Sequence, residues 1–317
     1  MERFSELSSE KQIQIREKIL NLQNSGLGYK RIIKRIAEED KIKIPLSTLS
    51  YWFNNEVKML GGKNYFKAEP SPELSYIIGC MHGDASISFN KKKQEYNLSL
   101  SAIDKDFVEK FSFSVSKLLR KEKNYPLWKC ARGHIYNTHI RCKELYNFIK
   151  EIKKDFEKAK PFIEKHPKEF VQGLADSEGC AQISAGKKFE CKVVIAYSTN
   201  LPLLKYTKEL LKNKFRINSN LILHKRKGIT DSIIDGRPIT RILDVYRLYI
   251  NRNEYISKFI SQINFAMQRK KERIETGFFI LQKYSRKEGP IIWKQIYKKR
   301  GNFWVKKNPN ALIRQLT

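Results

Sequence analysis

The chain contains an internal duplication, and this feature restricts its possible folds more than any other. One copy begins at Pro72 and reads Ile77-Ile-Gly79-Cys-Met-His-Gly83-Asp84, and the other begins at Pro167 and reads Val171-Gln-Gly173-Leu-Ala-Asp-Ser177-Glu178. In each copy the proline stands in the first turn of a predicted helix, where its missing N–H group has no cost. Each predicted helix is short and apolar and leads to a carboxylate. The repeat therefore predicts a fold built from two similar halves.

The elements after the repeated helix also follow the same order in both copies. The first copy predicts a strand, an amphipathic helix, a strand and a helix at 96–101, 107–119, 139–140 and 144–152. The second copy predicts the same elements at 193–199, 203–211, 244–250 and 254–263. Strands and helices are distinguished here by the spacing of their apolar residues. We therefore expect an α+β fold with one unit at 72–165 and another at 166–282.

A helical unit is predicted ahead of the repeats, at 1–60. Its first helix opens with a capping box formed by Ser9 and Gln12, and Ser47 is expected to cap a third helix. Two short helices separated by a turn are typical of helix-turn-helix domains. The candidates for reading bases on the third helix are Ser47, Thr48, Ser50 and Tyr51. A three-helix cap without contact to a DNA groove would show the same pattern.

Two further segments are rich in cations. The second copy predicts an extended hairpin, whose candidates for DNA binding are Lys225, Arg226, Lys227, Arg237 and Arg241. The extension at 283–317 holds ten basic residues and one acid between Lys283 and Arg314, with aromatic residues interleaved. This pattern suits contact with a nucleic-acid backbone, or a solvated helix whose apolar face packs on the body, and both interpretations stay open. Glycines and prolines predict a linker at 61–71.

The charge balance indicates the class of partner. The 317 residues include 63 Lys and Arg against 33 Asp and Glu, a formal net charge of +30. Such an excess repels itself and is typical of proteins that bind a polyanion. A lysine-rich surface on a thermophilic protein would come with a similar number of glutamates, which this chain lacks. Nucleic acid is therefore the expected partner.

Membrane and secreted classes are not favoured. No apolar run approaches the ~20 residues needed to span a bilayer, and the N-terminus lacks the apolar segment of a signal peptide. The five cysteines form no CxxC pair, so we expect reduced thiols, several of them in the core. The chain also lacks the terminal residues of an intein. We expect a free-standing or intron-encoded protein of the cytoplasm or nucleoid.

Small residues four positions apart mark one face of each repeated helix. They are Gly79 and Gly83 in the first copy, and Gly173 and Ser177 in the second. A stripe without bulky side chains lets two helix backbones approach closely. If the stripes face each other, Asp84 and Glu178 emerge side by side at the carbonyl ends of the helices. The negative potential of those helix ends adds to the repulsion between the carboxylates.

Two carboxylates in that position are costly unless divalent cations neutralise them. Hard oxygen ligands favour Mg²⁺. Metal ions held between paired carboxylates can activate water and stabilise the leaving oxygen of a phosphodiester. Such a site on a pseudo-twofold axis would cut both strands of a DNA duplex that lies across it.

The two repeated segments, 77–85 and 171–179, resemble two copies of the LAGLIDADG motif of homing endonucleases. The resemblance extends over about 72–275 and includes Phe259-Ile-Ser-Gln-Ile-Asn-Phe, which Lys270 and Lys271 follow. It implies two αββαββα halves whose antiparallel sheets form a saddle in the major groove. It also implies a single-chain, monomeric protein that reads a long asymmetric site in double-stranded DNA.

The resemblance also implies the composition of a metal site. The eighth motif position is the metal-binding acid of the family, and it falls on Asp84 and Glu178. The residues that follow them, Ala85 and Gly179, complete the implied site. Two or three Mg²⁺ ions would be shared by the two carboxylates, with Mn²⁺ or Ca²⁺ as substitutes in a crystal.

A lysine near the site that stabilises charge is implied as well. The best match is Lys270, and Lys158 is a weaker match in the first half. The first motif departs from the family at His82, where an acid is usual, and at Ala85, where glycine is usual. Neither is the position of the metal-binding acid, so the departures concern packing at the helix end. His82 is expected to be packed or solvated rather than a third metal ligand.

Two classes of function follow from this interpretation. The leading hypothesis is a site-specific endonuclease that hydrolyses phosphodiester bonds on both DNA strands. The alternative is a binding protein with the same fold, either an RNA intron maturase or a regulator that has lost cleavage. Pure binding gains nothing from two buried carboxylates, which favours the nuclease. A transposase or resolvase, suggested by the N-terminal helices, lacks a matching catalytic core.

Overall fold

The computed structural model describes residues 1–54, 64, 66–130, 133–234, 237–301 and 303–308. Its first half contains, in chain order, α4 (Pro72–Met81), β3 (Ala85–Asn90), β4 (Glu95–Ala102), α5 (Lys105–Leu118), β5 (Leu127–Lys129), β6 (Tyr136–Arg141) and α6 (Lys143–Lys154). Its second half contains α8 (Pro167–Glu178), β7 (Cys180–Ala185), β8 (Phe189–Ser198), α9 (Leu201–Phe215), β9 (Asn220–Lys225), β12 (Val245–Ile250) and α10 (Asn253–Gln262). The short helices η2 (Phe156–Ala159) and α7 (Lys160–Lys165) join the halves.

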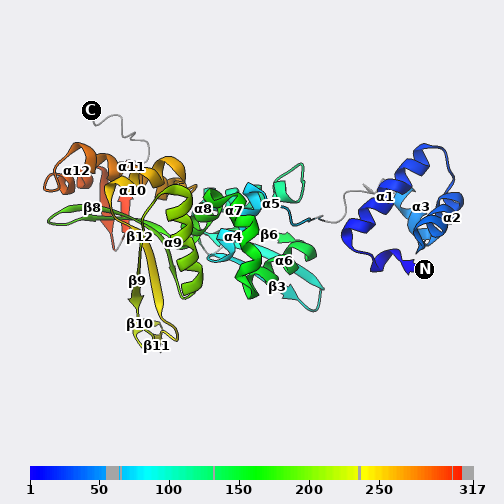
Figure 1. Ribbon diagram of the computed structural model, residues 1–317, viewed down its shortest axis with the longest axis horizontal. Helices are drawn as coiled ribbons and strands as arrows, with labels where there is room; N and C mark the ends of the chain where they lie inside the picture. Colours follow the sequence, from blue (N-terminus) through cyan, green and yellow to red (C-terminus); the bar gives the residue numbers. More distant parts are fainter. Residues whose placement is uncertain (55–63, 65, 131–132, 235–236, 302, 309–317) are drawn as a thin grey trace.

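The strands named for each half form an antiparallel sheet, and the two sheets share one topology. The strand order is β3-β4-β6-β5 in the first half and β7-β8-β12-β9 in the second. Helices α5 and α6 pack on the first sheet, and α9 packs on the second. Figure 1 shows the two halves side by side, with α4 and α8 between them. The expected α+β fold of two αββαββα halves is confirmed.

Helices α4 and α8 pack against each other through their glycine stripes. A methyl group on Gly79 would lie 2.4 Å from the carbonyl oxygen of Phe170, and one on Gly173 would lie 2.3 Å from that of Tyr76. Both obstacles are backbone atoms, which cannot move aside as the end of a flexible side chain can. The close approach of the helices therefore requires glycine at both positions, as the sequence predicted.

Replacing Gly173 by alanine should lower the free energy of unfolding by about 3 kcal/mol, near the upper end for overpacking of a core. The reason is that the added methyl group forces α8 away from the Tyr76 carbonyl. Chemical denaturation measures the change. Gly186→Ala is the matched control, because a methyl group there would meet nothing within 4 Å. Equal losses of stability in the two variants would contradict the packing argument.

The two halves share one hydrophobic core, whereas the N-terminal helices have a core of their own. The N-terminal unit contains β1 (Glu2–Arg3), η1 (Phe4–Glu6), α1 (Ser9–Asn24), α2 (Tyr29–Asp40), β2 (Ile42–Lys43) and α3 (Leu46–Asn54). The side chains of Ile19, Ile32, Ile36 and Leu49 are fully buried there. Strand β1 pairs in parallel with β2, which lies between α2 and α3 in the chain. The unit thus folds around its own apolar cluster.

Both predicted caps in this unit were wrong by one or two residues. Helix α1 is capped by Ser8, whose hydroxyl accepts a hydrogen bond from the Lys11 amide at 3.3 Å. Ser9 is thus the first residue inside the helix, and the Gln12 side chain donates to the carbonyl of Leu7 at 3.0 Å. In α3 the Pro45 carbonyl accepts the first helical hydrogen bonds, and Ser47 therefore lies inside the first turn.

The second half carries the predicted hairpin, formed by β10 (Thr230–Ile234) and β11 (Arg237–Thr240). Its base is closed by two backbone hydrogen bonds, from Gly228 to Arg241 at 2.8 Å and from Arg241 to Ile229 at 3.0 Å. Gly228 has a φ of +82°, a conformation that favours glycine. Figure 1 shows the hairpin extending well beyond the sheet that carries it.

The C-terminal extension packs on the second half. After α11 (Gln268–Lys283) come α12 (Gly289–Ile296), β13 (Tyr297–Arg300) and β14 (Phe303–Lys306). The Trp293 side chain is fully buried, and its ring stacks on Tyr297 with centroids 4.0 Å apart. The ring of Trp304 lies 6.0 Å away at a right angle. Of the two open interpretations, docking on the body is therefore confirmed, and Trp293 and Tyr297 are not available to stack on bases.

Cys80, Cys142 and Cys191 are buried free thiols, as expected from the cysteine spacing. Burial raises the pKa of Cys142 to about 12, so this thiol stays protonated and unreactive. In the described part of the chain, no helix combines the length and apolar character needed to cross a membrane.

Candidate functional site

The two motif carboxylates lie at adjacent ends of α4 and α8. Glu178 is the last residue of α8, and Asp84 follows α4 by three residues and directly precedes β3. A methyl group on Gly83, next to Asp84, would lie 2.4 Å from the Ser177 hydroxyl oxygen and 2.7 Å from the Glu178 Cγ atom. The ends of the two motifs are therefore in contact. The glycine stripes bring the carboxylates to one place.

The environment of these carboxylates disfavours their negative charge. Burial, and then the nearby charge of Asp84, raises the pKa of Glu178 to about 7. Burial also raises the pKa of Asp84, although its side chain is in part open to solvent. The Lys270 ammonium opposes both shifts. The site thus holds more negative charge than its own cation neutralises.

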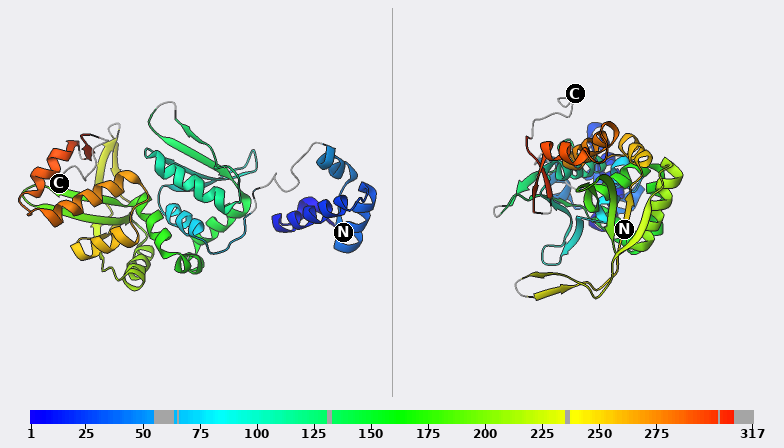
Figure 2. Two further views of the ribbon diagram at one scale, coloured as in Figure 1. Left: turned by 90° about the horizontal axis from the view of Figure 1, so that it is seen from above. Right: turned by 90° about the vertical axis from the view of Figure 1, so that its left-hand side faces the viewer.

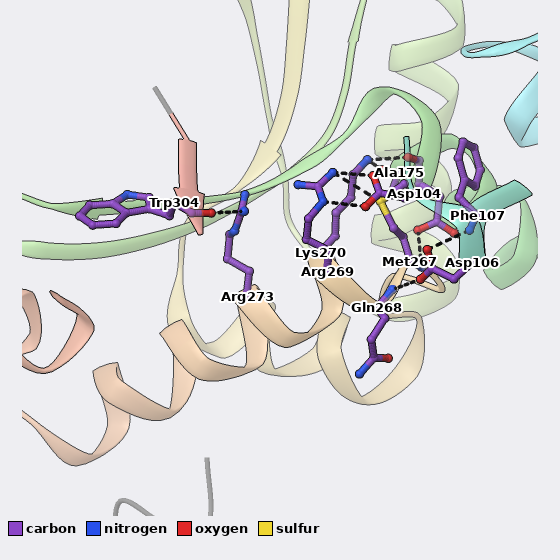
Figure 3. A network of polar contacts seen from close by, with 11 residues as sticks. Asp104, Asp106, Phe107, Ala175, Met267, Gln268, Arg269, Lys270, Arg273 and Trp304 are labelled. Carbon is purple, nitrogen blue, oxygen red and sulfur yellow. Dashed lines mark hydrogen bonds and ion pairs between the residues drawn. The ribbon is translucent and has the colours of Figure 1, made fainter. Parts of the chain in front are cut away.

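Lys270 lies at the carbonyl end of α8, as Figure 3 shows. Only 6% of it is exposed, and its ammonium donates hydrogen bonds to the carbonyl oxygens of Ala175, at 3.1 Å, and Asp176. These carbonyls belong to the last turn of the helix, where a cation offsets the negative end of the helix dipole. Burial lowers the pKa of Lys270, and the Asp176 carboxylate opposes that shift. The lysine therefore acts as a buried cap beside Glu178.

Asp176 connects α8 to the segment that carries this lysine. Its buried carboxylate accepts hydrogen bonds from the backbone amides of Ala266 and Met267 and from the Tyr76 hydroxyl at 3.0 Å. Burial raises the pKa of Asp176 to about 6, against these hydrogen bonds and the charge of Lys270. Because Tyr76 belongs to α4, Asp176 ties together both motif helices and the turn before α11.

His82 occupies the corresponding motif position in the first half. Its ring packs edge-on against Phe156 at 5.3 Å, and Phe156 in turn packs against Tyr206 of α9 at 5.3 Å. Burial, and then the charge of Lys153, lowers the pKa of His82 to about 4. Its Nε2 atom is buried without a hydrogen-bond partner among the described residues. His82 is thus a packed, neutral histidine, as expected.

A polar contact between the halves holds the first turn of α11. Arg269 forms two hydrogen bonds with Asp104, both at 2.8 Å, and the Gln268 amide donates to Asp106 at 2.6 Å (Figure 3). Asp104 and Asp106 belong to the start of α5 in the first half. We call this contact the inter-half clamp. It holds the residue directly before Lys270, so the first half helps to set the position of the buried cation.

A groove of about 540 Å³ opens beside Glu178. Its lining includes His82 from the first half and residues of β8, β9 and β12 and their flanks, namely Tyr197, Ser198, Thr199, His224, Lys225, Arg241 and Val245. The rings of Tyr197 and His224 lie 4.9 Å apart in this groove. Of the predicted DNA-binding cations, Lys225 and Arg241 are therefore next to a motif carboxylate, although no local sequence signal linked them to it.

Comparison with known proteins identifies the family. A family model described as a LAGLIDADG-like domain matches residues 165–264. The uncharacterized protein MJ0398 of Methanocaldococcus jannaschii is 33% identical over 276 residues, which are 87% of this chain and 97% of that protein. The chain belongs to the LAGLIDADG family.

Solved structures of LAGLIDADG proteins are among the matches, at low similarity. The crystal structure of I-DmoI in complex with DNA and manganese is 19% identical, covers 62% of this chain and 97% of that chain, and has a TM-score of 0.41. The LAGLIDADG meganuclease I-AabMI bound to uncleaved DNA is 14% identical, covers 70% of this chain and 96% of that chain, and also has a TM-score of 0.41. The DNA and the manganese in the first structure are ligands of I-DmoI, and the DNA in the second is a ligand of I-AabMI.

The remaining predicted site residues of this LAGLIDADG chain lie in several places. Gly179 caps the end of α8, where a methyl group would lie 2.4 Å from the Val194 carbonyl oxygen. Ala85 is buried at the start of β3. Lys158 lies on the surface and pairs with Glu151 at 3.3 Å, so its ammonium is directed to that carboxylate. The cation whose charge opposes the raised pKa of Asp84 is Lys270, from the second half.

The predicted DNA-binding residues on α3 and the hairpin remain predictions of the LAGLIDADG interpretation. On α3, Ser47 and Tyr51 are exposed, and Thr48 and Ser50 are half-buried. At the base of the hairpin, Arg226 and Lys227 are exposed, and the Lys227 amide donates to Asp244 at 2.8 Å. The Arg237 backbone lies in β11, and its side chain is outside the described part of the structure.

Proposed function

We propose that this LAGLIDADG protein is a site-specific endonuclease that hydrolyses both strands of double-stranded DNA with divalent metal ions. The observation that carries the proposal is the placement of Asp84 and Glu178 at adjacent ends of the motif helices, one from each half. A protein that only binds DNA gains nothing from two carboxylates that raise each other's energy. A pseudo-twofold site with one acid from each half also suits a duplex, whose strands are themselves related by twofold symmetry.

The donor set fits a hard divalent ion whose shell is completed from outside the protein. Among the described residues, no cluster of three or more His, Cys, Asp or Glu side chains could hold a metal. Two carboxylates supply oxygen ligands, and the backbone carbonyls of Ala85 and Gly179, water and DNA phosphates are the remaining candidates. Mg²⁺ commonly binds through one or two carboxylates together with water and substrate phosphates. The raised pKa of Glu178 indicates a site that a cation would stabilise.

The chain's own residues then have distinct roles in the reaction. When bound, a divalent ion would activate water and stabilise the leaving oxygen of the phosphodiester. Asp84 and Glu178 would hold that ion across the pseudo-twofold axis. Lys270 offsets negative charge at the carbonyl end of α8, where charge also builds up on the phosphate during hydrolysis. In the groove, Lys225 and Arg241 would hold the DNA backbone beside Glu178.

The direct test is cleavage of a DNA library by the full chain. Duplexes with randomised sequence, incubated with Mg²⁺, should yield linear products that share one long asymmetric site, and chelation of the metal should stop the reaction. Native mass measurement of the complex with a selected duplex should show one protein chain per site. Tight, sequence-selective binding with no cleavage in Mg²⁺ or Mn²⁺ would contradict the proposal and identify a binding protein instead.

Cleavage should depend on pH through Glu178. Its pKa, raised to about 7, means that the carboxyl loses its proton as the pH rises through that value, and only the ionised form binds a cation. The single-turnover rate should therefore rise between about pH 6 and 8 and then level off. More Mg²⁺ should move the midpoint to lower pH, because the metal competes with the proton. A rate that climbs without a plateau, at a midpoint insensitive to Mg²⁺, would exclude this carboxyl as its origin.

A further inference from the structure

The C-terminal hairpin presents a cationic surface. In β13, Lys298, Lys299 and Arg300 are consecutive and all exposed. No ion pair joins any of them to a carboxylate in the part of the chain that the structure describes. Lys298 and Arg300 lie on one face of the strand and Lys299 on the other, and cations this close repel one another, so an anionic partner would stabilise them. We call these three residues the cationic hairpin surface.

This surface is held firmly on the second half. The aromatic rings of Trp293 and Trp304 fix the inner side of the hairpin against α12. The Arg273 guanidinium donates to the Trp304 carbonyl oxygen at 2.7 Å, as Figure 3 shows, and Lys306 pairs with Glu272 at 3.3 Å. Arg273 and Glu272 belong to α11, the helix that carries Lys270. Cations on a docked hairpin lose less conformational entropy on binding than cations on a loose tail.

Hairpin β13–β14 lies on the same side of the molecule as hairpin β10–β11. In both views of Figure 2, the red hairpin β13–β14 is on the same side of the body as hairpin β10–β11. The same views place α9 on the opposite side. A duplex held in the groove beside Glu178, next to Lys225 and Arg241, would therefore run past β13 on the same side.

We propose that the cationic hairpin surface is a second DNA-binding site, which contacts phosphates of the duplex outside the stretch covered by the two sheets. The proposal rests on the proposed function for the position of the duplex, but it concerns binding alone. Phosphate contacts of this kind position a protein on DNA without reading its sequence. The surface thus extends the footprint at the end of the site held by the second half and adds affinity without entering the chemistry.

The test is the salt dependence of binding to a duplex of about 40 base pairs and arbitrary sequence, measured by fluorescence anisotropy. Each phosphate contact contributes about 0.9 to the slope of log affinity against log salt, so a variant with Lys298→Ala, Lys299→Ala and Arg300→Ala should lose about 2 to 3 from that slope. A charge-reversed variant with glutamate at the same positions should lose more. The thermal midpoint of each variant should stay close to that of the parent, because all three side chains are exposed.

The matched control neutralises Lys208, Lys212 and Lys214, which are exposed on α9 on the opposite side of the body. This control should leave the salt slope unchanged. Equal slopes for the hairpin variant, the control and the parent would overturn the proposal. A parent that binds with the expected slope but never cleaves would remove the proposed endonuclease and leave this surface standing. A parent that does not bind duplex DNA would overturn both.

Discussion

Replacing Glu178 by glutamine, or Asp84 by asparagine, is expected to abolish double-strand cleavage while DNA affinity stays nearly unchanged. Each change keeps the size of the side chain but removes a charge from the pair of acids at the adjacent ends of the motif helices. A metal-bound phosphodiester loses several kcal/mol of stabilisation without its ligand, so the rate should fall by on the order of 10³ or more. Single-turnover cleavage of a selected duplex measures the rate, and anisotropy in Ca²⁺ or chelator measures the affinity.

Although it abolishes cleavage, the substitution Glu178→Gln should increase the stability of the protein. The neighbouring charge of Asp84 and burial both raise the pKa of Glu178, so glutamine at that position removes a repulsion in the metal-free protein. We expect a higher thermal midpoint for Glu178→Gln at pH 8 than for the parent. Glu151→Gln, at an exposed ion pair with Lys158, is the matched control for loss of one carboxylate. Full cleavage by the double variant of Asp84 and Glu178 would exclude the motif acids from catalysis.

Replacing Lys270 by methionine should reduce the single-turnover cleavage rate by about a hundredfold, the size expected for one well-placed charge in an active site. The charge of the ammonium opposes the rise in pKa that burial causes at both motif carboxylates, and methionine fills its space without the charge. Stability should fall by only about 2 kcal/mol, because the carbonyls of Ala175 and Asp176 lose a donor while a desolvated charge is also removed.

Lys271→Met is the matched control for this substitution. Lys271 is the next residue on α11 and is half-buried. The change therefore removes the same charge one residue further along the chain than the lysine that caps α8. Its cleavage rate should stay within about threefold of the parent, as expected for a cation that only adds to the general field. Similar losses in both variants would show that net charge matters and that the position of Lys270 does not.

The motif helices and the order of elements could be predicted because local signals mark them. Proline at the first turn, glycine four residues apart and a terminal acid all lie within one short segment of chain. The extended hairpin had a similar local signature, with cations around turn residues. These features depend on neighbours in sequence, so a single sequence carries them.

Contacts between distant segments had no such signature. The inter-half clamp joins Asp104 to Arg269 across 165 positions, and nothing near either residue distinguishes it from a surface charge. Lys270 follows a recognisable motif segment and could be named from the sequence, whereas the weaker match in the first half, Lys158, pairs with Glu151, and the charge that acts on Asp84 is that of Lys270. Trp293 was ambiguous because an aromatic among cations suits either DNA or a core. Only the packing of α12 on the second half decides between them.

The inter-half clamp makes the two halves unlike each other in a way that their motifs do not. Asp104 precedes α5 and Asn200 holds the same place before α9, but Asn200 caps its own helix through the Leu203 amide at 3.0 Å. Next to α5, Asp104 accepts hydrogen bonds from Arg269 of the second half. On α9, the ring of Tyr206 packs against the ring of Phe156. A homodimer of the second half would therefore set two arginines against two asparagines, with no acid to receive them. The first half therefore supplies a contact that a second copy of the other half would not supply.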